Sequence, residues 1–316
     1  MRVGLIVDSA CDLPHEFAKK HDLFVLPVTA IVDGQTYTDT HDPALTEQFY
    51  QSGFMDKGRQ AETRAYTAEQ IHDLFMEKIV NEYDVAICET VTRSRSLIYE
   101  NAAEAMNTIM AKAEDARKAA GKGGRFSMRV IDSKQIFSGQ GLLAAHTLRL
   151  IDQGVSKNAL RHEVEAFTDK IYTCVIPRDL HYIRERARRR GDKSVSAVAA
   201  FLSKTLNMIP VIFGPAENAK AVAKTRSFDA AVEKVMDYAI GRVEAGVLTP
   251  YLSISCGMSW SEIEALPGLD RLRDACERNG VELLLSQMGI TSSIYVGPGA
   301  ICLAVAAEPH AFSDFQ

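Results

Sequence analysis

The first half of the chain alternates short apolar runs with segments of helical periodicity. Apolar runs predict strands at residues 3–7, 24–31, 85–88 and 128–131, and helices are predicted at 14–20, 45–51, 68–81, 97–119 and 136–153. The run at 3–7 is continuously apolar, which is typical of a strand that is buried on both faces. Strands and helices that alternate in this way indicate βαβ units and a mainly parallel sheet.

The second half has a different order of elements. Strands are predicted at 172–176, 210–213 and 251–256, helices at 157–169, 195–206, 228–244 and 261–278, and further apolar segments at 282–288 and 301–306 close the series. We therefore predict an α/β protein of two α/β domains. The N-terminal domain, residues 1–170, has a mainly parallel sheet with flanking helices. The C-terminal domain, residues 171–316, has a mixed α/β sheet, and a ligand is expected between the two.

Composition limits the classes of function. The formal net charge is −5 and there is no basic tail, which argues against nucleic-acid binding. One basic segment, residues 186–193, has two interpretations: a solvated loop, or a docking surface for a partner kinase or a phosphorylated product. No stretch is long and apolar enough for a membrane span, and the N-terminus lacks the apolar centre of a signal peptide, so a cytoplasmic protein is expected.

Cysteine and histidine spacing gives no sign of a metal centre. The six cysteines are widely separated and form no CxxC pair, which indicates reduced thiols and not a disulfide framework. The eight histidines include no HExxH motif. We expect no metal and no cofactor.

The first strand runs directly into the turn Asp8-Ser9-Ala10-Cys11-Asp12. Asp12 is expected to cap a helix whose first turn contains Pro14. Small and acidic residues at the carboxyl end of a strand lie where open α/β sheets bind their ligands. Taken on its own, this turn favours a purely structural role.

Two further blocks extend the pattern, and together the three resemble the DegV family of bacterial fatty-acid-binding proteins. The second block, residues 132–142, repeats the order strand, Asp-Ser, helix, and the third, residues 295–300, contains Gly-Pro-Gly. The resemblance covers nearly the whole chain. It implies a protein that binds one long-chain fatty acid in an apolar tunnel, without catalysis of its own, and presents it to a separate ATP-dependent kinase that forms the acyl phosphate.

The segment 88–96 follows a strand and precedes a helix, and it carries hydroxyls and two arginines. Backbone N–H groups at a helix N-terminus favour an anion, and arginine side chains suit a carboxylate. The alternative is that Ser96 only caps the helix and the arginines are solvated. By resemblance, Thr92 and Ser96 hold the fatty-acid carboxylate. Because Leu97 and Ile98 replace the family's Gly-Thr, Arg93 or Arg95 is a candidate to share that contact.

The remaining candidate residues also come from the resemblance. Thr63 stands where the family's threonine contacts the head group, whereas Thr67 is expected to cap the next helix. Gly297, Pro298 and Gly299 form a rigid turn that permits close approach of the backbone. Tyr295 occupies the position of the family's histidine, and a phenol can donate a hydrogen bond while staying neutral at pH 7.

An enzyme is the alternative hypothesis. It would act on a small carboxylate or a phosphorylated metabolite through the loop Thr92–Ser96, with Arg93 as a clamp. The familiar catalytic motifs are missing, however. Ala10 stands where a haloacid-dehalogenase-type phosphatase needs its second aspartate, Cys256 lacks the glycines of a nucleophile elbow, and Gly4 has no GxGxxG partner.

Overall fold

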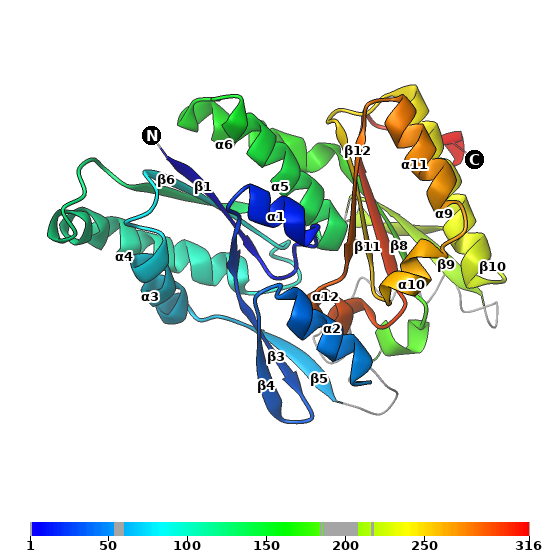
Figure 1. The fold of residues 1–316 in the computed structure, drawn as a ribbon, viewed down its shortest axis with the longest axis horizontal. Helices are drawn as coiled ribbons and strands as arrows, with labels where there is room; N and C mark the ends of the chain where they lie inside the picture. Colours follow the sequence, from blue (N-terminus) through cyan, green and yellow to red (C-terminus); the bar gives the residue numbers. More distant parts are fainter. Residues whose placement is uncertain (1, 54–59, 184, 186–207, 216–217, 316) are drawn as a thin grey trace.

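The computed structural model describes residues 2–53, 60–183, 185, 208–215 and 218–315. In this part of the chain, helices and three sheets are arranged in layers (Figure 1). The first sheet has the strand order β2-β1-β6-β7, and all its neighbours are parallel. Its strands are β1 (Val3–Asp8), β2 (Phe24–Leu26), β6 (Val85–Thr90) and β7 (Ser127–Asp132).

The second sheet is mixed and has the order β10-β9-β8-β13-β11-β12. Only β11 and β12 are parallel neighbours within it, and the other adjacent strands are antiparallel. Its strands are β8 (Ile171–Ile176), β9 (Ile209–Gly214), β10 (Lys220–Thr225), β11 (Tyr251–Cys256), β12 (Glu282–Gln287) and β13 (Ile301–Ala306).

A third, antiparallel sheet projects from the first half of the chain, at the bottom of Figure 1. It consists of β3 (Val28–Val32), β4 (Gln35–Asp39) and β5 (Ala61–Ala65). Its buried face packs against Phe49 of α2 (Pro43–Gln51) and against Ile290 and Ile294 of α12 (Ile290–Val296). This small sheet therefore connects the first half of the chain to a helix of the second half.

Helix α5 (Phe137–Asp152) lies between the first and second sheets and contacts both. Nearly all of its residues are buried, which explains why its sequence is apolar around most of its circumference. The outer layers are α3 (Ala68–Lys78) with α4 (Ile98–Ala119) on the first sheet, and α9 (Phe228–Ala245) with α11 (Leu269–Arg278) on the second. The other helices are α1 (His15–Lys20), α6 (Lys157–Phe167) and α10 (Trp260–Glu264).

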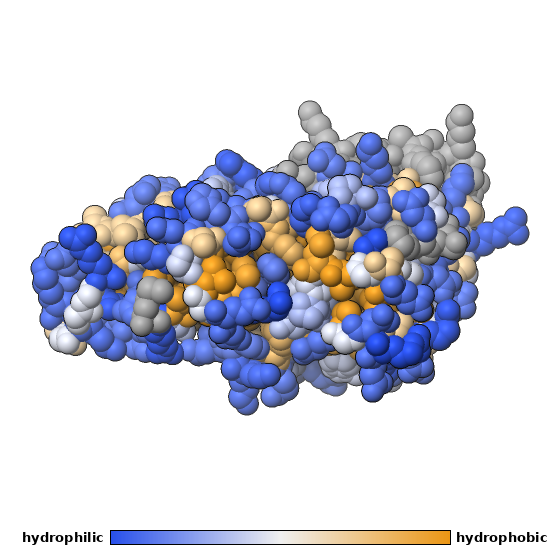
Figure 2. All heavy atoms as spheres, turned by 90° about the horizontal axis from the view of Figure 1, so that it is seen from above, coloured by the Kyte–Doolittle hydropathy of each residue, from blue (hydrophilic) through white to orange (hydrophobic). Residues whose placement is uncertain are grey.

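On the face seen from above, hydrophobic residues gather along the middle between polar margins (Figure 2). The cores themselves are buried and correspond to the layers. One cluster lies between the first sheet and α3 and α4, one surrounds α5, and one lies between the second sheet and α9 and α11. Each of these hydrophobic cores therefore lies between a sheet and the helices that cover it.

The predicted fold class is confirmed: a parallel sheet in the N-terminal part and a mixed sheet in the C-terminal part. Two boundaries were wrong. The strand predicted at 24–31 is divided at Pro27, which has no N–H for a ladder, and the helix predicted at 261–278 is divided at Gly268, which has a φ of 84°. The division at residue 170 stays a prediction. The helix predicted at 195–206 and the basic segment 186–193 lie outside the described residues.

The expected role of Asp12 as a helix cap was wrong. Helix α1 begins after Pro14 without a side-chain cap. The Asp12 carboxylate instead accepts hydrogen bonds from the backbone N–H of Gly289 (3.0 Å) and the hydroxyl of Ser292 (3.0 Å). Asp12 thus binds a backbone N–H group 277 residues away and not one at the start of the helix that follows it. Thr67 does cap α3 as expected, within a capping box with Gln70.

Candidate functional site

A cavity of about 590 Å³ lies beyond the carboxyl ends of β1 and β6. The position is the one at which open parallel sheets bind ligands. We call it the Ser96 pocket. It is lined by Asp8, Ala10, Val28, Thr63, Arg64, Ala65, Thr67, Val91, Arg93, Ser94, Arg95, Ser96, Leu97, Asn101, Ile136, Phe137, Thr291 and Tyr295. It thus brings together four residues that the sequence singled out, namely Thr63, Arg93, Ser96 and Tyr295.

Ser96 lies two residues before the start of α4. Its Oγ accepts a hydrogen bond from the backbone N–H of Ile98 (3.2 Å), so the hydroxyl hydrogen remains available to donate into the pocket. Helix α4 is 22 residues long, and its N-terminus adds a partial positive charge on the same side. The N-cap of α4 is Leu97 and not Ser96, so the role of Ser96 as a helix cap was wrong. Its role as part of an anion site stays a prediction.

Thr63 reaches the pocket from the third sheet. It lies in β5, opposite Ala30 of β3, and is half-buried. Among the described residues, none forms a hydrogen bond with its hydroxyl. Thr63 therefore offers a donor to a ligand without first breaking an internal contact.

Arg93 lines the pocket but is already paired. Its Nε donates to Oε1 of Glu100 (3.1 Å), a second guanidinium nitrogen lies 3.0 Å from the same oxygen, and the guanidinium stacks over the ring of Tyr99. More than half of its side chain is exposed. A ligand carboxylate at this place would compete with Glu100 for the same charge.

Asp8 is the acidic residue of the pocket wall. Its carboxylate is buried and accepts hydrogen bonds from the backbone N–H groups of Ala10 (2.9 Å) and Val91 (2.6 Å). Burial raises the pKa of this carboxyl to about 6, against the lowering effect of those hydrogen bonds. Near neutral pH, part of the Asp8 population is therefore protonated, which reduces its repulsion of an anionic ligand.

The apolar end of the pocket is closed by two aromatic rings. Phe137 and Tyr295 meet edge to face with ring centroids 5.7 Å apart. Phe137 is buried although its φ is 49°, in the left-handed region that non-glycine residues rarely adopt. A residue held in this conformation at the start of α5 has a fixed place in the wall.

Four of the expected site residues do not line the Ser96 pocket. Thr92 is fully buried, with its Oγ1 3.2 Å from Oγ of Ser94. Pro298 and Gly299 line a different cavity, of about 640 Å³. Gly297 has a φ of 92°, and a Cβ built on it would lie 2.7 Å from the ring of Tyr182, so the turn is tightly packed. Their roles in binding stay predictions.

Sequence reasoning missed other residues of the pocket, chiefly Arg64 and Asn101. Arg64 lies beside Thr63 in β5, where its side chain pairs with Glu62 (3.3 Å). Asn101 uses its Nδ2 to hold the carbonyl of Tyr66 at 2.7 Å. Arg95, which the sequence named as the alternative to Arg93, also lines the pocket.

Among the described residues, no group of three or more His, Cys, Asp or Glu side chains could hold a metal ion. In the same part of the chain, no helix combines the length and the hydropathy that crossing a bilayer requires. All six cysteines are buried and free.

Comparison with known proteins decides the family. The model of the family described as "Uncharacterised protein, DegV family" matches residues 2–308. The chain belongs to the DegV family. The resemblance that the three sequence blocks indicated is therefore confirmed.

Curated relatives align over the whole length of the chain. A DegV domain-containing protein of Xanthomonas axonopodis pv. citri is 39% identical over 313 residues, which cover 99% of this chain and 100% of the relative. A DegV domain-containing protein of Xanthomonas campestris pv. campestris is 37% identical with the same coverage.

Solved DegV structures have the same fold. A stearic acid-binding protein from Eubacterium ventriosum superposes with a TM-score of 0.77 at 21% identity, covering 96% of this chain and 98% of that one. DegV from Bacillus subtilis, described as a fatty acid binding protein, gives 0.73 at 16% identity, with 98% and 100% covered. The fatty acid kinase B3 protein of Streptococcus pneumoniae, loaded with linoleic acid, gives 0.69 at 16% identity, again with 98% and 100% covered.

Proposed function

We propose that this DegV protein binds one long-chain fatty acid in the Ser96 pocket and has no catalytic activity of its own. The carboxylate lies among the hydroxyls of Thr63 and Ser96 and the positive charges of the loop before α4. The acyl chain lies against the apolar wall formed by Val28, Ile136 and Phe137. The observation that carries the proposal is the meeting of Thr63 and Ser96, from two different elements, in one cavity of a DegV fold.

The dimensions and energetics of the pocket support a lipid ligand. Its volume of about 590 Å³ is within the range of about 300–1,000 Å³ typical of small-molecule sites. Each buried methylene stabilises the complex by about 0.8 kcal/mol. The head group therefore needs only a few hydrogen bonds, and their main effect is to orient the ligand.

A separate kinase is the second part of the proposal. The Streptococcus pneumoniae neighbour is described as a fatty acid kinase B3 protein, which supports a role in presenting the bound acid to an ATP-dependent kinase. In the alternative, an enzyme acting on a small metabolite, Arg93 would serve as a clamp. The pairing of Arg93 with Glu100 makes that role less favourable.

Native mass spectrometry of the protein purified from its own cells tests the first part. We expect a mass increase of one fatty acid per chain, identified after extraction. An empty protein that turns over a soluble carboxylate or phosphorylated metabolite would refute the carrier and support the enzyme.

Two substitutions test the placement of the head group. Ser96→Ala and Thr63→Ala each remove one hydroxyl that donates to the carboxylate, so each should weaken fatty-acid binding about tenfold or more, or about 1.5 kcal/mol. Displacement of a fluorescent fatty acid measures this. Thr38→Ala, at an exposed position of the same small sheet, is the matched control and should bind like the wild type. Unchanged affinity in both pocket variants would remove the proposed head-group site.

A further inference from the structure

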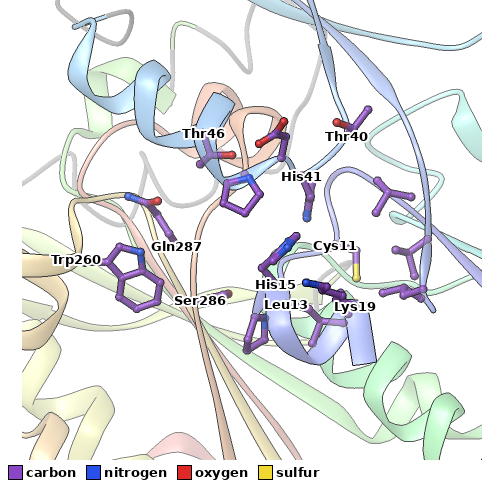
Figure 3. A pocket seen from close by; sticks show the side chains of 18 residues that line it. Cys11, Leu13, His15, Lys19, Thr40, His41, Thr46, Trp260, Ser286 and Gln287 are labelled. Atoms are coloured by element: carbon purple, nitrogen blue, oxygen red, sulfur yellow. The ribbon is translucent and has the colours of Figure 1, made fainter. Parts of the chain in front are cut away.

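A second cavity, of about 610 Å³, lies on the other side of the turn after β1 (Figure 3). Val7 of β1 and Cys11 of the turn line the second cavity, whereas Asp8 and Ala10 line the Ser96 pocket. The two cavities are therefore separate and share the turn as a wall. We call the second one the Trp260 cavity.

Three parts of the chain form the Trp260 cavity. Helix α1 contributes His15 and Lys19, the segment from β4 into α2 contributes Thr46, and the second half of the chain contributes Trp260 and Gln287. In Figure 3, Trp260 and Gln287 lie on one side of the cavity and His15 and Lys19 on the other. An aromatic surface thus faces a pair of basic side chains across the same space.

Trp260 is the only tryptophan of the chain, and 46% of it is exposed. It is one of the few large hydrophobic side chains of the described residues that are exposed rather than packed in a core. It lies at the start of the short helix α10 and forms part of the cavity wall. An exposed indole offers a flat face on which another ring can stack.

The basic and polar side chains of the cavity have donors and acceptors that are available to a ligand. Lys19 and His15 are exposed, and none of the described residues forms an ion pair or hydrogen bond with either side chain. The Nε2 of Gln287 donates to the carbonyl of Met258 (2.9 Å), which leaves its amide oxygen as an acceptor. The hydroxyl of Thr46 is also without a partner among the described residues, although the residue is only 7% exposed.

The acidic residue of this wall does not cancel the positive charge. Asp42 caps α2, and its Oδ1 accepts the backbone N–H groups of Ala44 (2.8 Å) and Leu45 (3.4 Å). Lys19 therefore keeps its charge for a ligand, and an ammonium group binds carboxylate or phosphate through charge-assisted hydrogen bonds.

We propose that the Trp260 cavity is a second ligand site, for a planar aromatic molecule that carries a carboxylate or a phosphate. The ring stacks on Trp260, the anionic group lies beside Lys19 and His15, and the polar edge of the ring pairs with Gln287 or Thr46.

The wall also contains apolar side chains, among them Leu13, Leu23 and Val25, against which a ring or an alkyl chain can pack. A ring with a polar edge is favoured over an alkyl chain, because the alkyl chain has no face to stack on Trp260 and would leave the amide and the hydroxyl unpaired. The site does not depend on lipid binding in the Ser96 pocket.

Tryptophan fluorescence reports directly on this site, because Trp260 is the only source of the signal. The purified full chain is titrated with adenosine monophosphate, a planar phosphate, and with 1-naphthoate, a planar carboxylate. We expect a saturable change with at least one probe, and at least tenfold weaker binding of its uncharged analogue, adenosine or 1-naphthalenemethanol. The probe that binds decides between phosphate and carboxylate.

Variants keep the test specific. Lys19→Ala should weaken binding of the charged probe about tenfold, whereas Lys20→Ala, its exposed neighbour outside the cavity wall, should bind like the wild type. Trp260→Leu should also lose most of its affinity for the charged probe. Binding to this variant is measured by calorimetry, because it lacks the tryptophan.

Three results would overturn the proposal. They are the absence of saturable binding by either probe, equal binding of the uncharged analogues, and equal affinity of the two lysine variants. Saturation of the Trp260 signal by one oleate per chain, unaffected by Lys19→Ala, would assign the cavity to the lipid and would also overturn it.

Discussion

The guanidinium of Arg93 is shared between the Ser96 pocket and Glu100, which lies 3.0 Å away. Glu100→Gln removes the competing charge, so a ligand carboxylate should bind about threefold more tightly, or about 0.6 kcal/mol, as is typical of exposed ion pairs. Arg93→Ala should weaken binding by a similar factor. Both effects are measured by displacement of a fluorescent fatty acid at low salt.

Glu104→Gln is the control for this experiment, because Glu104 is exposed on the same helix one turn further along. Equal tightening in Glu100→Gln and Glu104→Gln would show a general charge effect. An unchanged affinity in Glu100→Gln would remove Arg93 from the contact with the ligand.

Glu89 makes the stability of the fold dependent on pH. It is fully buried, its Oε1 accepts a hydrogen bond from Thr147 (2.5 Å), and its Oε2 has no partner among the residues that the structure describes. Burial raises its pKa to about 8, from a model-peptide value of 4.5. Between these two values the folded protein keeps a proton that the unfolded chain has released. The free energy of unfolding therefore falls as pH rises through this window, by about 1.4 kcal/mol per pH unit.

Glu89→Gln cannot titrate, and its stability should change less with pH. The free energy of unfolding of Glu89→Gln, relative to that of the wild type, should rise by on the order of 4 kcal/mol between pH 5 and pH 8. Urea unfolding at several pH values measures it, with Glu163→Gln at an exposed position of α6 as the control. Parallel pH profiles of the wild type and Glu89→Gln would contradict the assignment of the proton to Glu89.

At the level of elements, the packing of α5 against the turn after β1 depends on Gly141. A Cβ built at this position would lie 2.1 Å from the carbonyl oxygen of Asp12, a distance that requires the backbone to move. Gly141→Ala should therefore lower the free energy of unfolding by about 3 kcal/mol, despite the higher helix propensity of alanine. Urea unfolding measures the loss.

Gly123→Ala is the matched control for Gly141→Ala, since a Cβ at that position meets nothing within 4 Å. Its free energy of unfolding should stay within about 1 kcal/mol of the wild type. A loss as large in the control as in Gly141→Ala would show that the close approach to Asp12 is not the cause.

Sequence patterns predicted most elements because each pattern is local. The strand β11 and the strand β13 have the predicted bounds, and the α4 helix begins within one residue of its prediction. The breaks at Pro27 and Gly268 also had local signals, which the apolar periodicity obscured. The strands β4 and β5 are largely polar and were missed, since they are recognisable as strands only when paired with β3.

The candidate site was predictable only in part, for the same reason. The hydroxyl-rich loop before α4 was recognisable from its residues as a candidate anion site, whereas the roles of Thr92, Ser96 and Thr63 in holding a carboxylate came from the family resemblance. Arg64 carries no motif, and it lines the pocket because β5 of the third sheet contributes to the same cavity as the segments that follow β1 and β6. Helix α12 has no cap signal, and its bounds depend on contacts with residues more than 200 positions away.

At the scale of the molecule, α12 joins the two halves of the chain through buried polar contacts. Asp12 accepts from the N–H of Gly289, and Tyr50 donates to the carbonyl of Met288 (3.1 Å), partners 277 and 238 residues apart. Because Thr291 and Tyr295 of this helix also line the Ser96 pocket, the same contacts fix one wall of the candidate site.

Asp39 is the strongest of these connections. Its Oδ2 accepts from the N–H (2.8 Å) and the hydroxyl (2.7 Å) of Thr291, and its Oδ1 accepts from the N–H of His41 (3.1 Å). Asp39→Ala leaves buried donors unpaired, so the free energy of unfolding should fall by about 3 kcal/mol. Asp42→Ala, which removes an exposed cap three residues on, should cost only about 1 kcal/mol. Hydrogen–deuterium exchange should rise at Ile290–Val296 in Asp39→Ala alone, and equal protection of α12 in both variants would show that Asp39 does not hold the two halves together.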